Sequence, residues 1–213
     1  MNPKTHHELW HGPAGPLDMS IDHPSNGPAL GLAVIAHPHP LFGGTKDNKV
    51  VQTLARAFLH MGYITVRFNF RGVGQTAGTH DNGVGEALDL EYVVETAKTK
   101  LLPNTLHNTP IAMAGFSFGA FVTTHAAASL KAKGHSIGKL ALVGTATSRF
   151  SVKDVPENTL VIHGEQDDTV PLESVMRWAQ PQNIPLVVMP GVEHFFHGKL
   201  PQLKDLVVRY YPC

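Results

Sequence analysis

The residue type most able to do chemistry in this sequence is the serine of a Gly-x-Ser-x-Gly motif at residues 115–119. An apolar run precedes the motif and an alanine-rich stretch follows it, which is the pattern of a strand, a sharp turn and a helix with Ser117 at the turn. A turn this tight strains the serine backbone, and the flanking glycines leave room for strand and helix to meet. The motif therefore indicates a nucleophilic serine held out above the edge of a sheet.

A serine hydroxyl is a weak nucleophile at neutral pH, so it needs a general base and an acid that orients the base. Two later loops contain the required residue types. The first loop contains Asp167 and Asp168, and the second contains His194 and His197. The residue types alone do not separate the two adjacent aspartates, although His197 is more simply a surface or capping residue because it lies where the last helix is expected to begin.

Apolar runs and amphipathic segments alternate along the chain and predict the elements that position these loops. Strands that alternate with helices at this spacing imply one α/β domain over residues 1–213, with a mainly parallel sheet and helices on both faces. In such sheets the chemistry lies at the carboxyl ends of the strands, where these loops are found. A hairpin is expected over 6–23, strands over 30–36, 63–70, 111–114, 140–144, 160–163 and 186–189, and helices after 47 or 48, after 81 or 82, after 117, near 172 and over 200–210.

Several segments together resemble the α/β-hydrolase superfamily, in particular its small members with little or no cap that are related to dienelactone hydrolase. The resemblance covers nearly the full length and is carried by residues 12–15, 36–40, 67–74, 115–119, 163–171 and 191–199. It implies an α/β-hydrolase fold with Ser117 as nucleophile, His194 as general base and Asp167 as the acid that orients it. The family pattern His-Gly-x-x-Asp-x-x-Val-Pro selects Asp167 over Asp168.

An acyl-transfer site also needs N–H donors directed at the developing oxyanion. One is expected to be the backbone N–H of Phe118, the residue after the nucleophile. In the loop His37-Pro38-His39-Pro40 both prolines lack an N–H, which leaves the amide of His39 as the second donor. Among the phenylalanines near these loops, Phe42 and Phe195 are the candidates for lining a substrate pocket.

Composition excludes several classes of function. Lysine plus arginine and aspartate plus glutamate number 17 each, so neither a nucleic-acid partner nor an anionic membrane surface is expected. No apolar run approaches the length of a membrane span. A single cysteine, Cys213, cannot form an internal disulfide, which favours a cytoplasmic location.

Two weaker patterns are not interpreted as sites. Residues 72–77 match a loose dinucleotide fingerprint, but no helix follows at once to receive a pyrophosphate. The pairs His37 and His39, and His194 and His197, lack carboxylate ligands at a recognisable spacing, so no metal is expected. The proposed chemistry also needs no cofactor.

The sequence therefore predicts a serine hydrolase that cleaves a carboxylic ester or a related acyl bond of a small molecule. The connection between the strands at 140–144 and 160–163 is too short for a helical lid, so an open site is expected. A thioesterase, lactonase, peptidase or perhydrolase on the same fold, and a non-catalytic binding module, remain alternatives. The oligomeric state is left open.

Overall fold

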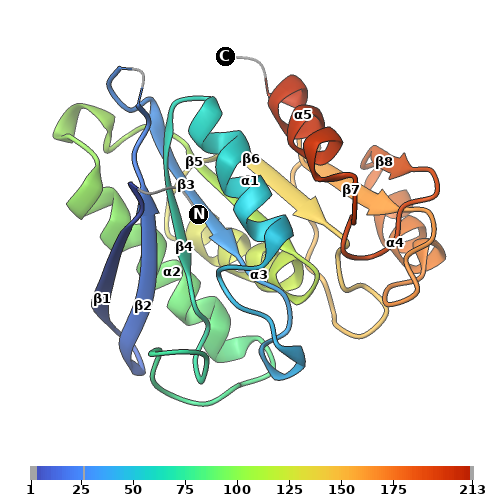
Figure 1. The fold of residues 1–213 in the computed structure, drawn as a ribbon, viewed down its shortest axis with the longest axis horizontal. Helices are drawn as coiled ribbons and strands as arrows, with labels where there is room; N and C mark the ends of the chain where they lie inside the picture. The colour runs from blue at the N-terminus through green and yellow to red at the C-terminus, as the bar shows by residue number, and fades with distance from the viewer. Residues whose placement is uncertain (1–3, 26, 212–213) are drawn as a thin grey trace.

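An eight-stranded sheet organises the chain in the computed structural model, which describes residues 4–25 and 27–211 (Figure 1). The strand order is β1-β2-β4-β3-β5-β6-β7-β8. The strands are β1 (His6–Gly12), β2 (Gly15–Asp22), β3 (Gly31–Ala36), β4 (Tyr63–Phe68), β5 (Ile111–Phe116), β6 (Ile137–Val143), β7 (Leu160–Gly164) and β8 (Leu186–Met189).

The sheet is parallel except at one edge. The expected hairpin is formed by β1 and β2, which pair antiparallel with Gly12 opposite Gly15, and β2 pairs antiparallel with β4. All other neighbours are parallel. Strands β3 and β5 lie at the centre and are buried over their whole length, as their continuous apolar runs require. The predicted fold class is confirmed.

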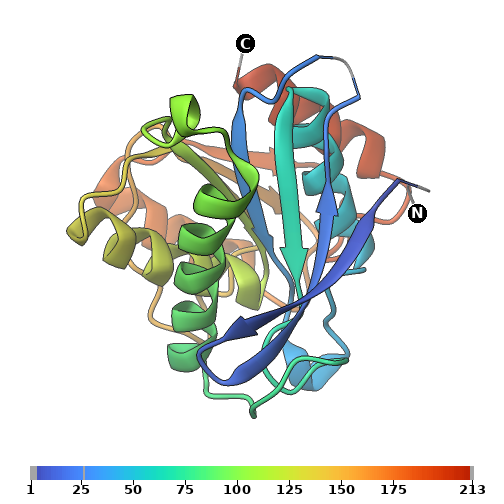
Figure 2. The ribbon, with the colours of Figure 1, turned by 90° about the vertical axis from the view of Figure 1, so that its left-hand side faces the viewer.

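Helices cover both faces of the sheet (Figures 1 and 2). The helices α2 (Val84–Leu101) and α3 (Phe118–Ala132) pack on one face, and α4 (Leu172–Ala179) joins them there by packing on Val161 of β7. The helices α1 (Lys49–His60) and α5 (Leu200–Tyr210) pack against each other on the opposite face. Short 3-10 turns occur at η1 (Pro40–Phe42), η2 (Asn104–Leu106) and η3 (Gln180–Gln182).

The start of α2 differs from the prediction. Its N-cap is Gly83 rather than Asp81 or Asn82, and the carboxylate of Glu86 accepts the N–H groups of Asp81 and Gly83. The α1 cap is Asn48, whose side chain accepts from the first turn of the helix. Asp81 still contributes, because its carboxylate accepts the N–H of Gly85.

The sequence also predicts that the apolar residues of this helix form its buried side, namely Val84, Ala87, Leu88, Tyr92, Val94 and Ala97, and this prediction is partly wrong. Val84 and Leu88 are exposed, whereas the charged side chains of Glu86 and Asp89 are fully buried. Asp89 can be buried because Arg71, which precedes the helix, donates two hydrogen bonds of 2.8 Å to its carboxylate. Glu86 can be buried because its carboxylate accepts backbone N–H groups at the start of the helix. A paired carboxylate can be buried where an unpaired one cannot.

The connection between β6 and β7 runs over residues 144–159 and contains no helix or strand. The connection is therefore as short as the sequence predicts, and the fold has no large cap at this position. Over residues 4–25 and 27–211, none of the helices has the length and apolarity required to cross a membrane.

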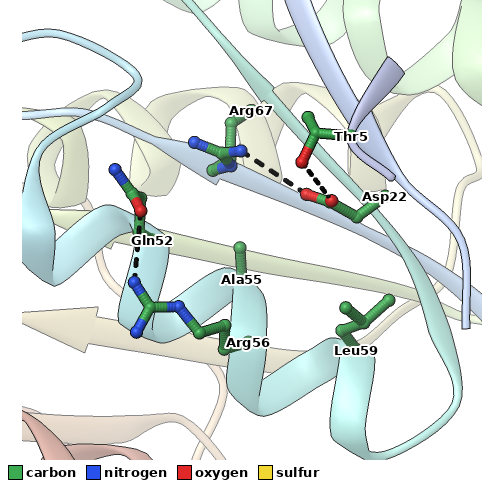
Figure 3. Close-up of a pocket in the computed structure, with 7 residues that line it drawn as sticks. All are labelled: Thr5, Asp22, Gln52, Ala55, Arg56, Leu59 and Arg67. Atoms are coloured by element: carbon green, nitrogen blue, oxygen red, sulfur yellow. Dashed lines mark hydrogen bonds and ion pairs between the residues drawn. The ribbon is translucent and has the colours of Figure 1, made fainter. Parts of the chain in front are cut away.

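A cavity of about 350 Å³ lies beside α1, away from the serine motif (Figure 3). Arg67 of β4 is its central group and is buried at 6% exposure. The Arg67 guanidinium donates to the backbone oxygen of Lys46 at 3.0 Å and to Asp47 Oδ1 at 3.1 Å, and it lies 3.4 Å from Asp22 Oδ2. Arg67 thus ties β2 and β4 to the loop that begins α1, and its positive charge is balanced by the two carboxylates.

Candidate active site

Ser117 occupies the turn between β5 and α3. Its backbone angles are φ 57° and ψ −119°, a region that a residue with a Cβ adopts only when the surrounding structure enforces it. The Ser117 N–H donates to the carbonyl of Val143 on the neighbouring strand β6 at 2.9 Å, which holds the turn in place. The strained conformation expected from the motif is present.

The glycines of the motif allow two close approaches. A Cβ at Gly115 would overlap the backbone of Gly119 and Ala120, so the strand and helix could not meet at this angle. A Cβ at Gly119 would overlap the carbonyl oxygens of Ala36 and His37. Gly119 therefore lets the loop after β3 lie directly against the start of α3.

Three loops bring Ser117, His194 and Asp167 into one hydrogen-bonded chain. The Nε2 atom of His194, from the loop after β8, lies 3.0 Å from Ser117 Oγ. The Nδ1 atom of the same ring lies 2.6 Å from Oδ2 of Asp167, which follows β7. All three residues are buried, at 7%, 2% and 7% exposure respectively. The three side chains that the sequence singled out are thus brought together.

Of the two adjacent aspartates, only Asp167 reaches the histidine. Its second oxygen, Oδ1, accepts the backbone N–H groups of Thr169 at 3.0 Å and Val170 at 2.7 Å. Burial alone would raise the pKa of Asp167, but the hydrogen bond from His194 and those from the backbone outweigh it and lower that pKa. Asp168 is exposed and contacts the hydroxyl of Thr169. His197 is also exposed and pairs with Glu193.

His163, a buried residue to which the sequence assigned no role, lies behind Asp167. Its Nε2 donates to the carbonyl of Val170 at 2.9 Å and lies 3.6 Å from Asp167 Oδ2. Burial lowers the pKa of His163, so its ring is neutral at neutral pH. Because Val170 in turn donates to Asp167, His163 fixes the loop that holds the carboxylate. The signal available in the sequence was the position of His163 at the start of the His-Gly-x-x-Asp pattern.

The two N–H groups expected to face an oxyanion are those of His39 and Phe118. Over the described parts of the chain, neither a backbone nor a side-chain oxygen accepts the N–H of His39 or of Phe118. Their rings lie 4.7 Å apart, so the two residues are neighbours across the serine turn. The loop is held from behind by His37, which accepts the Phe70 N–H at 2.9 Å and donates to the Pro38 carbonyl at 2.7 Å.

A cavity of about 320 Å³ opens above Ser117 and His194. Phe42 and Phe195 line it, as expected, and both project into solvent at 75% and 44% exposure. Arg149, from the turn after β6, also lines the cavity. The sequence alone did not indicate this residue as part of the site. The cavity is open to solvent on the side of Phe42 and Phe195, whose side chains are exposed.

In the described portion of the chain, no group of three or more histidine, cysteine, aspartate or glutamate residues is placed to hold a metal ion. Residues 72–77 form a loop, and α2 begins only at Val84.

The fold of the chain is similar to that of two solved structures, and its sequence is similar to that of a further protein. XC6422 from Xanthomonas campestris, described as a serine hydrolase of the α/β class without lid, is 36% identical, with a TM-score of 0.87 over 99% of this chain and 94% of that chain. An α/β serine hydrolase homologue from Coxiella burnetii is 38% identical, with a TM-score of 0.86 over 97% of both chains. An uncharacterized protein of Rickettsia prowazekii (strain Madrid E) is 29% identical in an alignment of 210 residues covering 94% of this chain and 86% of that protein.

The fold and these similarities define the chain as a serine hydrolase of the α/β-hydrolase superfamily, of the kind that has no lid. The family model of the X-Pro dipeptidyl-peptidases (S15 family) matches residues 16–138, which is more than half of the chain. The chain therefore belongs to this family.

Proposed function

We propose that the chain is a serine esterase that hydrolyses small carboxylic esters through an acyl-enzyme. The observation that carries the proposal is the continuous chain of hydrogen bonds from Ser117 Oγ through His194 to Asp167, at 3.0 and 2.6 Å. In this mechanism His194 Nε2 takes the hydroxyl proton as Ser117 attacks the ester carbonyl. His194 then gives that proton to the departing alcohol, and water activated by His194 releases the acid.

Asp167 has two tasks in this scheme. Its Oδ2 accepts the Nδ1–H of His194 and so keeps the ring in the tautomer whose Nε2 is free to accept a proton. Its negative charge stabilises the imidazolium that forms as the serine attacks. The lowered pKa of Asp167 supports the proposal, because the carboxylate is then ionised at neutral pH and can accept the hydrogen bond from the ring.

The N–H groups of His39 and Phe118 stabilise the oxyanion in this scheme. Both are unpaired in the described chain, and Phe118 is the first residue of α3, where the helix dipole is positive. Preorganised donors of this kind contribute about 3 kcal/mol each to transition-state stabilisation in acyl transfer.

A covalent probe tests the proposal. A fluorophosphonate should label the wild type at Ser117, and 4-nitrophenyl esters of short acids should be hydrolysed. Both reactions should be lost in Ser117→Ala. Ser148→Ala, at an exposed serine near the site, is the matched control and should retain both. A wild type that neither reacts with the probe nor hydrolyses any ester in a panel of esters, thioesters and lactones is a binding module, and the proposal is then wrong.

A second candidate is a peptidase, because the matching family model is described as X-Pro dipeptidyl-peptidase. An enzyme of that kind must bind the positively charged amino terminus of its substrate, for which a carboxylate is the natural partner. None of the described residues that line the cavity is an aspartate or glutamate. We therefore expect Gly-Pro-4-nitroanilide to be cleaved far more slowly than a 4-nitrophenyl ester, and the reverse order would favour the peptidase.

A further inference from the structure

Arg149 is the only lysine, arginine, aspartate or glutamate among the described residues that line the cavity above Ser117. The remaining polar groups in the lining are imidazoles, hydroxyls, an amide and backbone. A cavity whose wall contains one positive charge and no negative charge favours binding of an anionic ligand.

The main chain of Arg149 is fixed although its side chain is exposed. The N–H groups of Arg149 and Phe150 both reach the carbonyl of Ala146, at 3.4 and 3.2 Å. The ring of Phe150 stacks on Phe121 at 4.7 Å and lies 5.2 Å from the ring of Phe118, the residue after the serine. Phe150 therefore anchors the turn that presents Arg149 to the serine.

Within residues 4–25 and 27–211, no carboxylate pairs with the Arg149 guanidinium and no side-chain hydrogen bond involves it. The acidic groups nearest the serine are engaged elsewhere, since Asp167 bonds to His194 and Glu193 accepts the N–H groups of Phe195 and His197. Across the cavity, burial and the neighbouring His80 lower the pKa of His39, the Glu86 carboxylate opposes them, and the positive charge of Arg149 acts in the lowering direction.

We propose that Arg149 binds an anionic group of the substrate, so that the preferred substrates are esters carrying a carboxylate in either the acyl part or the alcohol part. The inference rests on the esterase function proposed above. The guanidinium forms a bidentate pair with the carboxylate, and the exposed rings of Phe42 and Phe195 contact the apolar part of the ester. Arg149 is thus a specificity-determining residue rather than a participant in bond cleavage.

Two matched pairs of esters separate the two positions of the charge. Monomethyl glutarate against dimethyl glutarate places a carboxylate in the acyl part. 4-Acetoxybenzoate against its methyl ester places the carboxylate in the leaving group. For each pair the readout is the ratio of kcat/KM for the anionic ester to kcat/KM for the neutral ester, because a general loss of activity cancels in this ratio.

We expect the ratio to fall about 10-fold in Arg149→Gln for at least one pair, since a hydrogen-bonded charge pair of this kind contributes on the order of one power of ten. Arg149→Lys should retain part of the preference, and 0.5 M salt should weaken it in the wild type because the pair is exposed. The matched control is Arg209→Gln, which removes an exposed arginine at the end of α5 and should leave the ratio unchanged.

A binding measurement checks the inference independently of turnover. Glutarate should slow fluorophosphonate labelling of Ser117 in the wild type more than in Arg149→Gln. Ratios and protection that are the same in wild type and Arg149→Gln would overturn the role of Arg149 while leaving the esterase function intact. A wild type whose Ser117 does not react and that cleaves none of these esters would instead remove the proposed function, and the inference with it.

Discussion

Asp167 accepts hydrogen bonds on both of its carboxylate oxygens, from the His194 ring on one and from the backbone of residues 169 and 170 on the other. In the proposed mechanism this carboxylate sets the tautomer of His194. Replacing it with an amide of the same shape presents an N–H or a weaker acceptor to the ring and favours the wrong tautomer.

We therefore expect Asp167→Asn to lower kcat for ester hydrolysis by about 10⁴-fold. Asp168→Asn is the matched control, because its side chain is exposed and does not reach His194, and its kcat should stay within about 3-fold of the wild type. Steady-state kinetics on one 4-nitrophenyl ester measures both. A larger loss in Asp168→Asn than in Asp167→Asn would reassign the acid.

Single residues could be predicted from the sequence where a local pattern specifies them. Ser117 follows from its Gly-x-Ser-x-Gly turn, and the resemblance to a family selected Asp167 and His194. His163 was marked only by its place at the start of the His-Gly-x-x-Asp pattern, which assigned it no role, and Arg149 was not marked by any pattern. The first acts through Val170, and the second reaches the site only because Phe150 packs on α3, and neither contact is a regularity of the sequence.

At the scale of the elements, charge pairs made by the buried Arg67 connect strands to the loop that begins α1. Arg67 of β4 pairs with Asp22 of β2 (Figure 3). It also donates to Asp47, which precedes α1. Removing one partner of a buried pair leaves an uncompensated charge, and Asp22 is itself only 5% exposed.

Arg67→Met should therefore lower the free energy of unfolding by about 3 kcal/mol. Arg56→Met is the control, because Arg56 is exposed and its hydrogen bond is to the side chain of Gln52, so a change below about 0.5 kcal/mol is expected. Urea denaturation followed by circular dichroism measures both values. Equal effects of the two substitutions would show that the buried pairs do not stabilise the fold.

The elements themselves were largely evident in the sequence, because strands buried on both faces leave continuous apolar runs and amphipathic helices leave periodic ones. The burial of Asp89 on α2 was not evident, since it depends on Arg71 from the loop after β4. The sequence therefore predicts the helix α2 itself, but not which side of it is buried, because that depends on the pairing of Asp89 with Arg71.

At the scale of the whole molecule, buried neutral histidines link stability to pH. Burial lowers the pKa of His37 to about 3, and the positive charge of Lys46 acts in the same direction against the opposing effect of the Pro38 carbonyl. In the unfolded chain the pKa of this histidine returns to its ordinary value of about 6.5. Between these two values the unfolded state binds more protons, so the stabilisation is complete above about pH 6.5 and is lost as the pH falls towards 3.

We expect His37→Gln to flatten the dependence of the free energy of unfolding on pH by up to about 1.4 kcal/mol per pH unit between pH 4 and 6. His11→Gln, at an exposed histidine of β1, should leave the slope unchanged. Urea denaturation at several pH values gives both slopes. An unchanged slope in His37→Gln would mean that His37 is protonated in the folded protein.

The absence of a cap over residues 144–159 also has a kinetic consequence. An enzyme with no lid to open has no reason to respond to a lipid interface. The rate of hydrolysis of a short-chain ester should therefore rise hyperbolically with concentration and show no jump as the substrate passes its solubility limit. A steep increase at that limit would indicate that part of the chain moves to uncover the site.

The central claim is that Ser117 carries the acyl group during turnover. Acid quenching of the reaction with a 4-nitrophenyl ester, followed by digestion and mass spectrometry, measures this directly. The expected result is one added acyl mass on the peptide that contains Ser117, absent in Ser117→Ala. Acylation of a different residue, or undiminished turnover in Ser117→Ala, would contradict the account.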